Sequence, residues 1–365
     1  MARNNRIFYA TQAVLLRPQN SDGTSPYDNW LRPRGLQSVG ITTNFTLEQV
    51  FQLGQIELYD NVENVPEVQV TLNKVLDGTM PLYLMCVGGD TGPISGGNNK
   101  DLAEIANNRV NVRFGVFSDT NTGASGAPVQ YVDCSGMYLS SVSYTVPVDG
   151  NATEDITLVG NNKLWNVTNG LDVVSDWGFN SGGTPETSAG TARRYKFSAV
   201  NSVIPTGGTR GSIPNVSGYG DTVRGPYIQS ITLSTDLGRE AINELGRMAP
   251  YYRYVTFPVE VTSEFQVVAA DGDQMEASDF SSSAGGCDAT YKNLDNQAIK
   301  VVICGTGTGE TLAIDLGDKN KLTSVNYTGG DTGGGNATVT YSYQNFNKFK
   351  VAVTGTQYTT ENVVS

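Results

Sequence analysis

Short runs in which apolar and polar residues alternate recur along the chain. Residues 38–42 read SVGIT and residues 230–234 read SITLS, so apolar side chains fall on every second position. Because successive side chains of a strand point to opposite faces of its sheet, each run predicts a strand with one apolar face and one small, polar face. The chain also holds 42 glycines, which accept the positive φ angles of tight strand connections. The pattern predicts a mainly β protein.

The two runs belong to a long internal repeat. Residues 37–66 align with residues 229–258 without a gap, at an offset of 229 − 37 = 192. In each copy the strand is followed by a residue that can cap a helix, Asn44 or Asp236. A glycine suited to end a helix comes next, Gly54 or Gly246. We therefore expect a helix of about two turns in both copies.

The repeat continues past Pro66 and Pro258, each of which opens a second strand. The matching core-facing residues of this strand are Val68 and Val70 in the first copy and Val259 and Val261 in the second. The offset is now 259 − 68 = 191, and a slip of one residue implies a bulge or a gap. Four later matches keep the same order: 110–114 with 299–303, 139–145 with 322–328, 151–153 with 336–338, and 162–163 with 347–348.

The repeat predicts two tandem domains. We place the first at residues 1–180 and the second at residues 193–365, with a linker rich in Gly, Ser and Thr at 181–192. The two copies would begin near Ile7 and Tyr195, where the similarity is weak. The polar segment 85–108 is expected to form either an arm that reaches a neighbouring part of an assembly or a mobile surface loop with a short helix at 101–106. The glycine-rich segment 305–309 is expected to form a turn.

Charge and rare residues narrow the class of protein. The net charge is −12, which lacks the basic surface with which proteins grip nucleic acid. The absence of histidine removes His-dependent nucleophilic sites and metal motifs, and we expect no enzyme, cofactor or metal site. Cys86 and Cys304 lie in apolar runs, 82–87 and 299–304, that read as strands, so buried free thiols from a reducing cytosol are expected. Neither a membrane span nor a secretory signal is predicted.

The residues of the repeat resemble the tail tube proteins of long-tailed bacteriophages. The similarity runs from the first strand, through Leu53-Gly54-Gln55 or Leu245-Gly246-Arg247, to the strand that follows the proline. The closing segments 139–145 and 322–328 and the two Asn-Ala-Thr triplets are also similar to that family. The resemblance covers most of both halves and includes no catalytic signature.

The resemblance implies two β-sandwiches, each flanked by one short α-helix, whose strands join those of neighbouring subunits in a β-barrel around a lumen. Rings of this family are usually hexamers of single-domain subunits that stack into a tube, and the genome leaves through the lumen. Because this chain carries two copies, we expect three chains in each pseudo-hexameric ring.

The resemblance also implies partners and a location. The partners would be further copies of this chain, a tape measure protein, tail terminator and baseplate or distal tail proteins, and a sheath protein if the tail is contractile. Double-stranded DNA would pass through the lumen without specific binding. The protein would lie in the virion tail after assembly in the cytoplasm of the bacterial host.

Polar strand positions are candidates for lining the lumen. They are Ser38, Thr42, Glu67, Gln69, Thr71, Ser230, Thr232, Ser234, Glu260, Thr262 and Glu264. A mildly acidic face with few lysines would repel phosphates and let DNA slide. The alternative is the ordinary solvated face of a sandwich.

Tyr251, Tyr252, Arg253 and Tyr254 are candidates for a subunit interface, because Tyr and Arg are enriched in binding hot spots. Packing of these side chains on their own sheet is the alternative.

Two other functions stay open beside the tube subunit. A tube initiator or distal tail ring protein would share the fold. A carbohydrate-binding pair of β-sandwiches is a different class, which needs exposed aromatic platforms. The tryptophans Trp30, Trp165 and Trp177 are too scattered along the chain to favour it.

Overall fold

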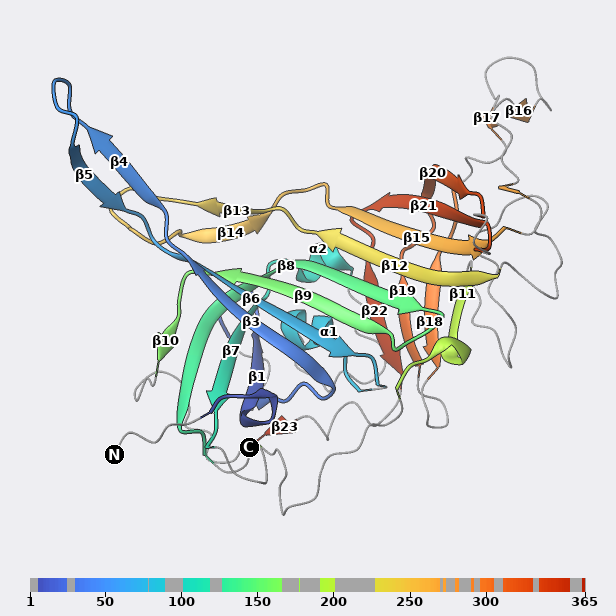
Figure 1. Cartoon of the computed structure of the whole chain (residues 1–365), viewed down its shortest axis with the longest axis horizontal. Helices are drawn as coiled ribbons and strands as arrows, with labels where there is room; N and C mark the ends of the chain where they lie inside the picture. Colours follow the sequence, from blue (N-terminus) through green and yellow to red (C-terminus); the bar gives the residue numbers. More distant parts are fainter. Residues whose placement is uncertain are drawn as a thin grey trace.

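Figure 1 shows the chain as a computed structural model. The structure describes residues 6–24, 30–77, 79–88, 101–118, 127–165, 177, 191–200, 227–269, 272–273, 280–281, 290–291, 296–304, 311–330, 335–354 and 363–364. Residues 181–190 of the expected linker, segment 89–100, Cys287 and the turn at 305–309 lie outside the described residues.

Eight antiparallel strands form one continuous layer. Figure 1 shows this layer extending across the molecule. Four come from the first half of the chain: β3 (Leu36–Asn44), β6 (Glu67–Val75), β9 (Thr153–Gly160) and the C-terminal part of β8 (Gln130–Pro147). Four come from the second half: β12 (Ile228–Asp236), β15 (Glu260–Val268), β21 (Thr338–Phe346) and β20 (Lys321–Thr328). Their spatial order is β3-β6-β9-β8-β12-β15-β21-β20, so the two halves meet where β8 pairs with β12. We call these eight strands the main sheet.

The main sheet contains the same four-strand arrangement twice, but one predicted match is wrong. Thr43 lies opposite Val68, and its repeat counterpart Thr235 lies opposite Val261. Val68 therefore corresponds to Val261, at an offset of 261 − 68 = 193, and not to Val259. The second copy has one extra residue between its proline and its strand. Alternation repeats every two residues, so the sequence pattern could not separate an offset of 191 from one of 193.

The closing strands of the two copies are equivalent in register as well as in sequence. Leu139 pairs with Leu158, Leu322 pairs with Tyr343, and in both copies a bulge follows this pair at once. The offsets are 322 − 139 = 183 and 343 − 158 = 185. The first offset is that of the match between 139–145 and 322–328, and the second is that of the match between 151–153 and 336–338. The strand register therefore confirms both matches.

Two β-hairpins occupy the segments in which the sequence predicted helices. Arm 1 joins β4 (Leu47–Phe51) to β5 (Leu58–Glu63), and arm 2 joins β13 (Arg239–Ile242) to β14 (Tyr252–Val255). Gly54 and Gly246 lie at the hairpin tips with φ of 91° and 85°. Glycine at positive φ suits a tight turn as well as a helix end, which explains the wrong prediction. Both arms extend beyond the same end of the main sheet (Figure 1).

The expected cap residues have another role, since Asn44 and Asp236 are the last residues of their strands. The Asp236 carboxylate accepts a hydrogen bond from the Gly238 amide, at 3.0 Å, in the turn that leads into arm 2. The same side-chain chemistry that caps a helix therefore serves a turn between strands here.

A second layer packs against the main sheet. One part of this layer consists of β1 (Gln12–Gln19), β7 (Arg109–Val116) and the N-terminal part of β8, extended by β2 (Trp30–Leu31) and β10 (Leu164–Trp165). The C-terminal strand β23 (Val363–Val364) pairs with β2. In the second half the layer is a separate sheet of β11 (Phe197–Val200), β18 (Lys300–Cys304), β19 (Thr311–Asp315) and β22 (Lys350–Thr354). Short 3-10 helices precede β1 at Tyr9–Thr11 and β11 at Arg194–Lys196. A two-stranded sheet joins β16 (Phe280–Ser281) to β17 (Thr290–Tyr291).

Two short α-helices lie in the first half, α1 (Leu82–Val87) and α2 (Leu102–Ile105). The second confirms the helix expected at 101–106. The first corrects the prediction of a strand at 82–87. All six residues of α1 are buried, and a short apolar run reads alike for a buried strand and a buried helix.

One hydrophobic core spans both halves of the chain. It includes Leu72, Val142 and Tyr144 from the first half, and Leu233 and Phe265 from the second. The predicted inward-facing Val68, Val70, Val259 and Val261 are all buried. Burial of this shared core therefore holds the two copies together beside their strand pairing.

Candidate assembly surfaces

The pairing of β8 with β12 is an internal seam between the two copies. Leu233 lies opposite Tyr144 in this register, and Ser234 lies opposite Ser143. Leu233 and Tyr144 face the core, and both are fully buried. Beyond the paired strands the Leu237 amide donates to the Ser140 carbonyl at 2.8 Å, and the Leu237 side chain is also buried. The internal seam is thus a well-packed junction of two edge strands.

The outer strands of the main sheet, β3 and β20, are the repeat counterparts of the two seam strands. Among the described residues, no strand pairs with the outer side of either. Residues at these open edges are more exposed than their counterparts at the seam. Tyr327 is 50% exposed where Tyr144 is buried, and Phe45 is 71% exposed where Leu237 is buried. Unpaired backbone beside exposed apolar side chains is a template for pairing with another chain.

The predicted lumen-facing residues all lie on one side of the main sheet, away from the core. Each is exposed or half-buried: Ser38, Thr42, Glu67, Gln69, Thr71, Ser230, Thr232, Ser234, Glu260, Thr262 and Glu264. Neighbouring strands connect them through small polar groups, such as the Ser234 and Thr262 hydroxyls at 2.7 Å. We call this side the polar face. Its surroundings in an assembly stay a prediction.

The polar face is acidic. By the alternation of the strands it carries the acids Asp155, Asp236, Glu260 and Glu264, together with Glu67, whose carboxylate pairs with Arg253 of arm 2. The eight strands, which are described in full, contain only two basic residues. Lys74 is buried on the opposite face, and Lys321 lies at one end of β20. A face of this kind repels phosphate groups rather than binding them.

Arm 2 packs on the first copy, and the predicted interface residues divide between packed and exposed positions. Arg253 is buried and pairs with Glu67, with 3.0 Å between Nη2 and Oε2. The Tyr252 hydroxyl donates to the Asn107 carbonyl at 3.1 Å, and its ring meets that of Tyr138 edge-on. Tyr251 and Tyr254 are 56% and 41% exposed. Tyr252 and Arg253 thus join the two copies within one chain.

Arm 1 has no such support among the described residues, and it is exposed along both strands. The sequence prediction of a helix missed this feature. The arm carries large apolar side chains in solvent: Phe51, Leu53, Ile56, Leu58 and Tyr59. Leu53 and Ile56, near the tip, are fully exposed. Apolar residues gathered on a projecting hairpin are typical of a contact surface.

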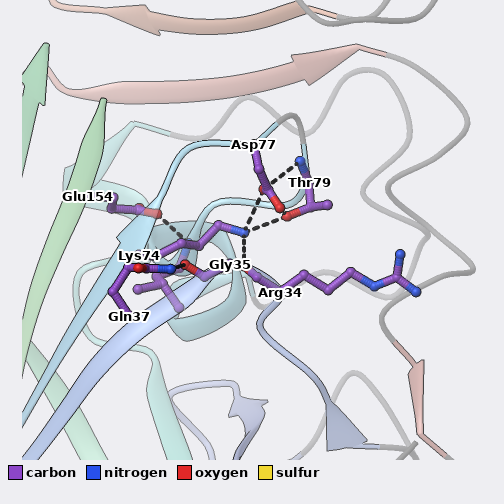
Figure 2. A network of polar contacts seen from close by, with 8 residues as sticks. Arg34, Gly35, Gln37, Lys74, Asp77, Thr79 and Glu154 are labelled. Atoms are coloured by element: carbon purple, nitrogen blue, oxygen red, sulfur yellow. Dashed lines mark hydrogen bonds and ion pairs between the residues drawn. The ribbon is translucent and has the colours of Figure 1, made fainter. Parts of the chain in front are cut away.

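A buried polar network lies where β6 ends (Figure 2). The Lys74 ammonium donates to the Arg34 carbonyl at 2.6 Å and to the Thr79 hydroxyl at 2.5 Å, and lies 3.4 Å from the Asp77 carboxylate. These three acceptors match its three N–H donors. Burial lowers the Lys74 pKa, and the nearby charges of Asp77 and Glu154 oppose this shift. With its donors satisfied, Lys74 holds the connection between β6 and α1 in place.

Glu154 joins the same region from the neighbouring strand, where it lies opposite Lys74. Its carboxylate accepts hydrogen bonds from the Leu82 and Tyr83 amides, at 2.6 and 2.8 Å, and from the Tyr144 hydroxyl at 2.7 Å. Burial raises the Glu154 pKa, although these bonds and Lys74 act to lower it. Glu154 therefore fixes the first turn of α1 to the main sheet.

Buried thiols are present as expected. Cys86 and Cys134 are buried and free, and burial raises the pKa of Cys134 to about 11. The pKa of Cys86 is also raised, mainly by burial. Cys304 belongs to β18, which confirms the strand predicted there. The two described thiols are protonated in the core at neutral pH and pack as small apolar groups.

Other site types and comparisons with known proteins add no assignment. Within the described part of the chain, no group of three or more Cys, Asp or Glu side chains is placed to hold a metal ion. No helix among the described residues has the length and apolar character needed to cross a membrane. Profiles of known protein families give no match to this sequence, and a search of curated proteins finds no significant relative.

Proposed function

We propose that this protein is a structural virion protein, the tail tube subunit of a long-tailed bacteriophage. The observation that carries the proposal is the open main sheet. Its two outer strands, β3 and β20, each have one side that no other described strand covers, and they are repeat counterparts of β12 and β8, which already pair with each other. A sheet whose outer edges have complementary partners in the next copy can continue from chain to chain, and it closes into a ring when the rotation between successive chains closes. The resemblance of the repeat to tail tube proteins supports the same function.

The size of the closed sheet fits three chains. Three copies of the eight main-sheet strands give 3 × 8 = 24 strands. With strands about 4.8 Å apart and tilted by about 40°, the backbone circle would be about 48 Å across. Side chains narrow this opening, but a DNA duplex still passes. Two chains would give 16 strands and a circle of about 32 Å by the same geometry, which is too tight once side chains are added.

The polar face would line this barrel. Its acids and small hydroxyl groups give phosphates no cationic site, so the genome slides past without specific binding. The arms extend beyond one end of the sheet and carry exposed apolar tips, so they are suited to contact neighbouring chains or the next ring. Tape measure, terminator and baseplate or distal tail proteins, with a sheath if the tail contracts, would be the other partners, in a tail assembled in the host cytoplasm.

Electron microscopy of the purified full-length chain tests the proposal. At raised protein concentration, or with its tape measure protein, we expect stacked rings whose cross-section contains three chains around a lumen. Compact monomers under all assembly conditions would contradict a tube subunit. Six whole chains around the lumen would contradict the ring of three.

The alternatives give different results. A tube initiator or distal tail ring protein would form one ring per particle rather than many stacked rings. For a carbohydrate-binding protein, Trp30 and Trp177 are unsuitable platforms because both are buried, although Trp165 is 51% exposed. Glycan binding by a stable monomer would favour that class.

A further inference from the structure

The internal seam offers a template for a second seam between chains. β12 and β3 correspond at an offset of 192, so Ser234 is equivalent to Thr42. β8 and β20 correspond at an offset of 183, so Ser143 is equivalent to Asn326. Ser234 lies opposite Ser143 in the internal seam. Transfer of both offsets to the open edges therefore places Thr42 of one chain opposite Asn326 of the next.

The side chains at the open edges suit this register. On the core side the seam pair Leu233 and Tyr144 becomes Ile41 and Tyr327, again an aliphatic residue against a tyrosine. The next pair, Thr235 with Val142, becomes Thr43 with Val325, with the residue types unchanged. A slip of one residue would turn Ile41 toward the polar side of the partner strand. Register is strongly specified when one face is buried.

Side chains at these edges are exposed in the single chain, whereas the equivalent side chains at the internal seam are buried by the neighbouring strand. Tyr327 and Phe45 are largely exposed, whereas their seam counterparts Tyr144 and Leu237 are buried. Leu237 reaches past the end of the paired strands, where its amide bonds to the Ser140 carbonyl. The counterparts of these two groups are the Phe45 amide and the Thr323 carbonyl, at 237 − 192 = 45 and 140 + 183 = 323.

We propose that chains join through a second seam with the register of the internal one, β3 of one copy antiparallel to β20 of the next, with Thr42 opposite Asn326 and Phe45 covering the end of β20. The occupant of each open edge is thus a second copy of this chain. This inference rests on the proposed ring-forming function, and it adds the residues that meet.

The hydrogen-bond pattern makes the Thr42–Asn326 pair a suitable site for a disulfide. At the internal seam the Val148 amide donates to the Gln229 carbonyl, and the Leu237 amide donates to the Ser140 carbonyl. Hydrogen-bonded and non-hydrogen-bonded pairs alternate along an antiparallel ladder. Ser234 and Ser143 lie three positions away from the hydrogen-bonded pair of Leu237 and Ser140, so they form a non-hydrogen-bonded pair. Such pairs have Cα atoms about 4.5 Å apart, within the range that a disulfide spans. The same holds for their counterparts, Thr42 and Asn326.

The test is cysteine cross-linking in the assembled full-length protein. Cys287 and Cys304 are replaced by serine, and Cys86 and Cys134 stay because they are buried. After mild oxidation the variant Thr42→Cys with Asn326→Cys should give covalent dimers and trimers on a non-reducing gel. The matched positive control, Ser143→Cys with Ser234→Cys, should form a disulfide within one chain. Register controls combine Thr42→Cys with Ser324→Cys or Thr328→Cys, two residues away on the same face.

Each outcome decides between defined conclusions. Efficient cross-links from Thr42→Cys to Asn326→Cys, with few to the register controls, support the proposed seam. Rings or tubes that cross-link better through residue 324 or 328, or through none of these positions, overturn the register and leave the tube function standing. Folded chains that show the internal disulfide but never form rings overturn the proposed function together with the seam.

A second variant tests the role of Phe45 without relying on a disulfide. Phe45→Leu, which copies the seam residue Leu237, should keep assembly. Phe45→Asp should remain a folded monomer because Phe45 is exposed in the single chain. Normal rings formed by Phe45→Asp would show that Phe45 does not cover the neighbouring strand.

Discussion

Tyr144 and Tyr327 occupy equivalent positions in the two copies of the repeat, yet Tyr144 is fully buried and Tyr327 is half exposed. The difference follows from their strands. β8 is covered by β12, whereas β20 is the outermost strand of the main sheet. One chain therefore contains two equivalent strands, β8 with a neighbouring strand on this side and β20 without one among the described residues.

This relationship predicts that a tyrosine-to-alanine substitution affects folding stability at position 144 and assembly at position 327. Tyr144→Ala should lower the free energy of unfolding by roughly 3–5 kcal/mol, because it leaves a cavity in the core and removes a hydrogen bond to Glu154. Tyr327→Ala should change the stability of the monomer by only about 0.5 kcal/mol, as exposed substitutions do, but should weaken assembly. Urea unfolding measures the first effect and sedimentation the second. Tyr327→Ala that assembles like the wild type would contradict a role at the ring seam.

The sequence predicted much of the main sheet because its strands have one buried and one solvated face. The alternation at 38–42 and 230–234 and the match of 139–145 with 322–328 predicted these strands and the equivalence of the two closing strands. The polar face followed from the same alternation, since residues such as Thr42 and Glu264 point away from the core.

The sequence could not predict the features that depend on contacts between distant segments. Gly54 and Gly246 fit a helix end and a hairpin tip equally well, so the arms were missed. The run 82–87 is apolar throughout, so its helical form depends on Glu154, more than sixty residues later, which binds the free amides of its first turn. Pairing of β8 with β12 is likewise invisible in local patterns.

Lys74 allows a test of the buried network. Lys74→Met should lower the free energy of unfolding by about 3–5 kcal/mol, because it leaves the Asp77 carboxylate buried without its cation. Lys300→Met is the matched control, since Lys300 lies 3.8 Å from Asp315 in a partly exposed pair. That control should cost less than about 1 kcal/mol. Equal losses in urea unfolding would show that the Lys74 network does not stabilise the fold.

The second copy forms the same strand pairing without a charged pair. Lys74 lies opposite Glu154 in the first copy, and the equivalent pair in the second copy is Val267 with Val339. Both valines are fully buried. Strand pairing therefore does not need the charged pair, and its role is to hold α1 and the preceding connection.

Glu154 predicts a pH dependence of stability. Its pKa is raised in the folded state, chiefly by burial, so the folded protein binds this proton more tightly than the unfolded chain. The contribution of Glu154 to stability is therefore greatest below its ordinary pKa of 4.5, and it falls as the pH rises through the raised pKa. Glu154→Gln cannot titrate and serves as the reference. The free energy of unfolding of the wild type minus that of Glu154→Gln should fall between pH 4 and neutrality, and a difference that rises would contradict the shift.

The polar face predicts how charge controls DNA passage through an assembled tube. Glu260 and Glu264 are exposed on this face, so replacing both by lysine should leave folding and assembly intact. The change raises the net charge by 2 × 2 = 4 per chain beside the proposed path of the genome. Tubes of this variant should retain double-stranded DNA at low salt and release it at high salt, because lysine–phosphate contacts displace counterions. The control Glu104→Lys with Asp318→Lys makes the same charge change at exposed positions outside the eight strands, and its tubes should retain little DNA. Equal retention by the two variants in a filter-binding assay would place the polar face on the outside of the tube.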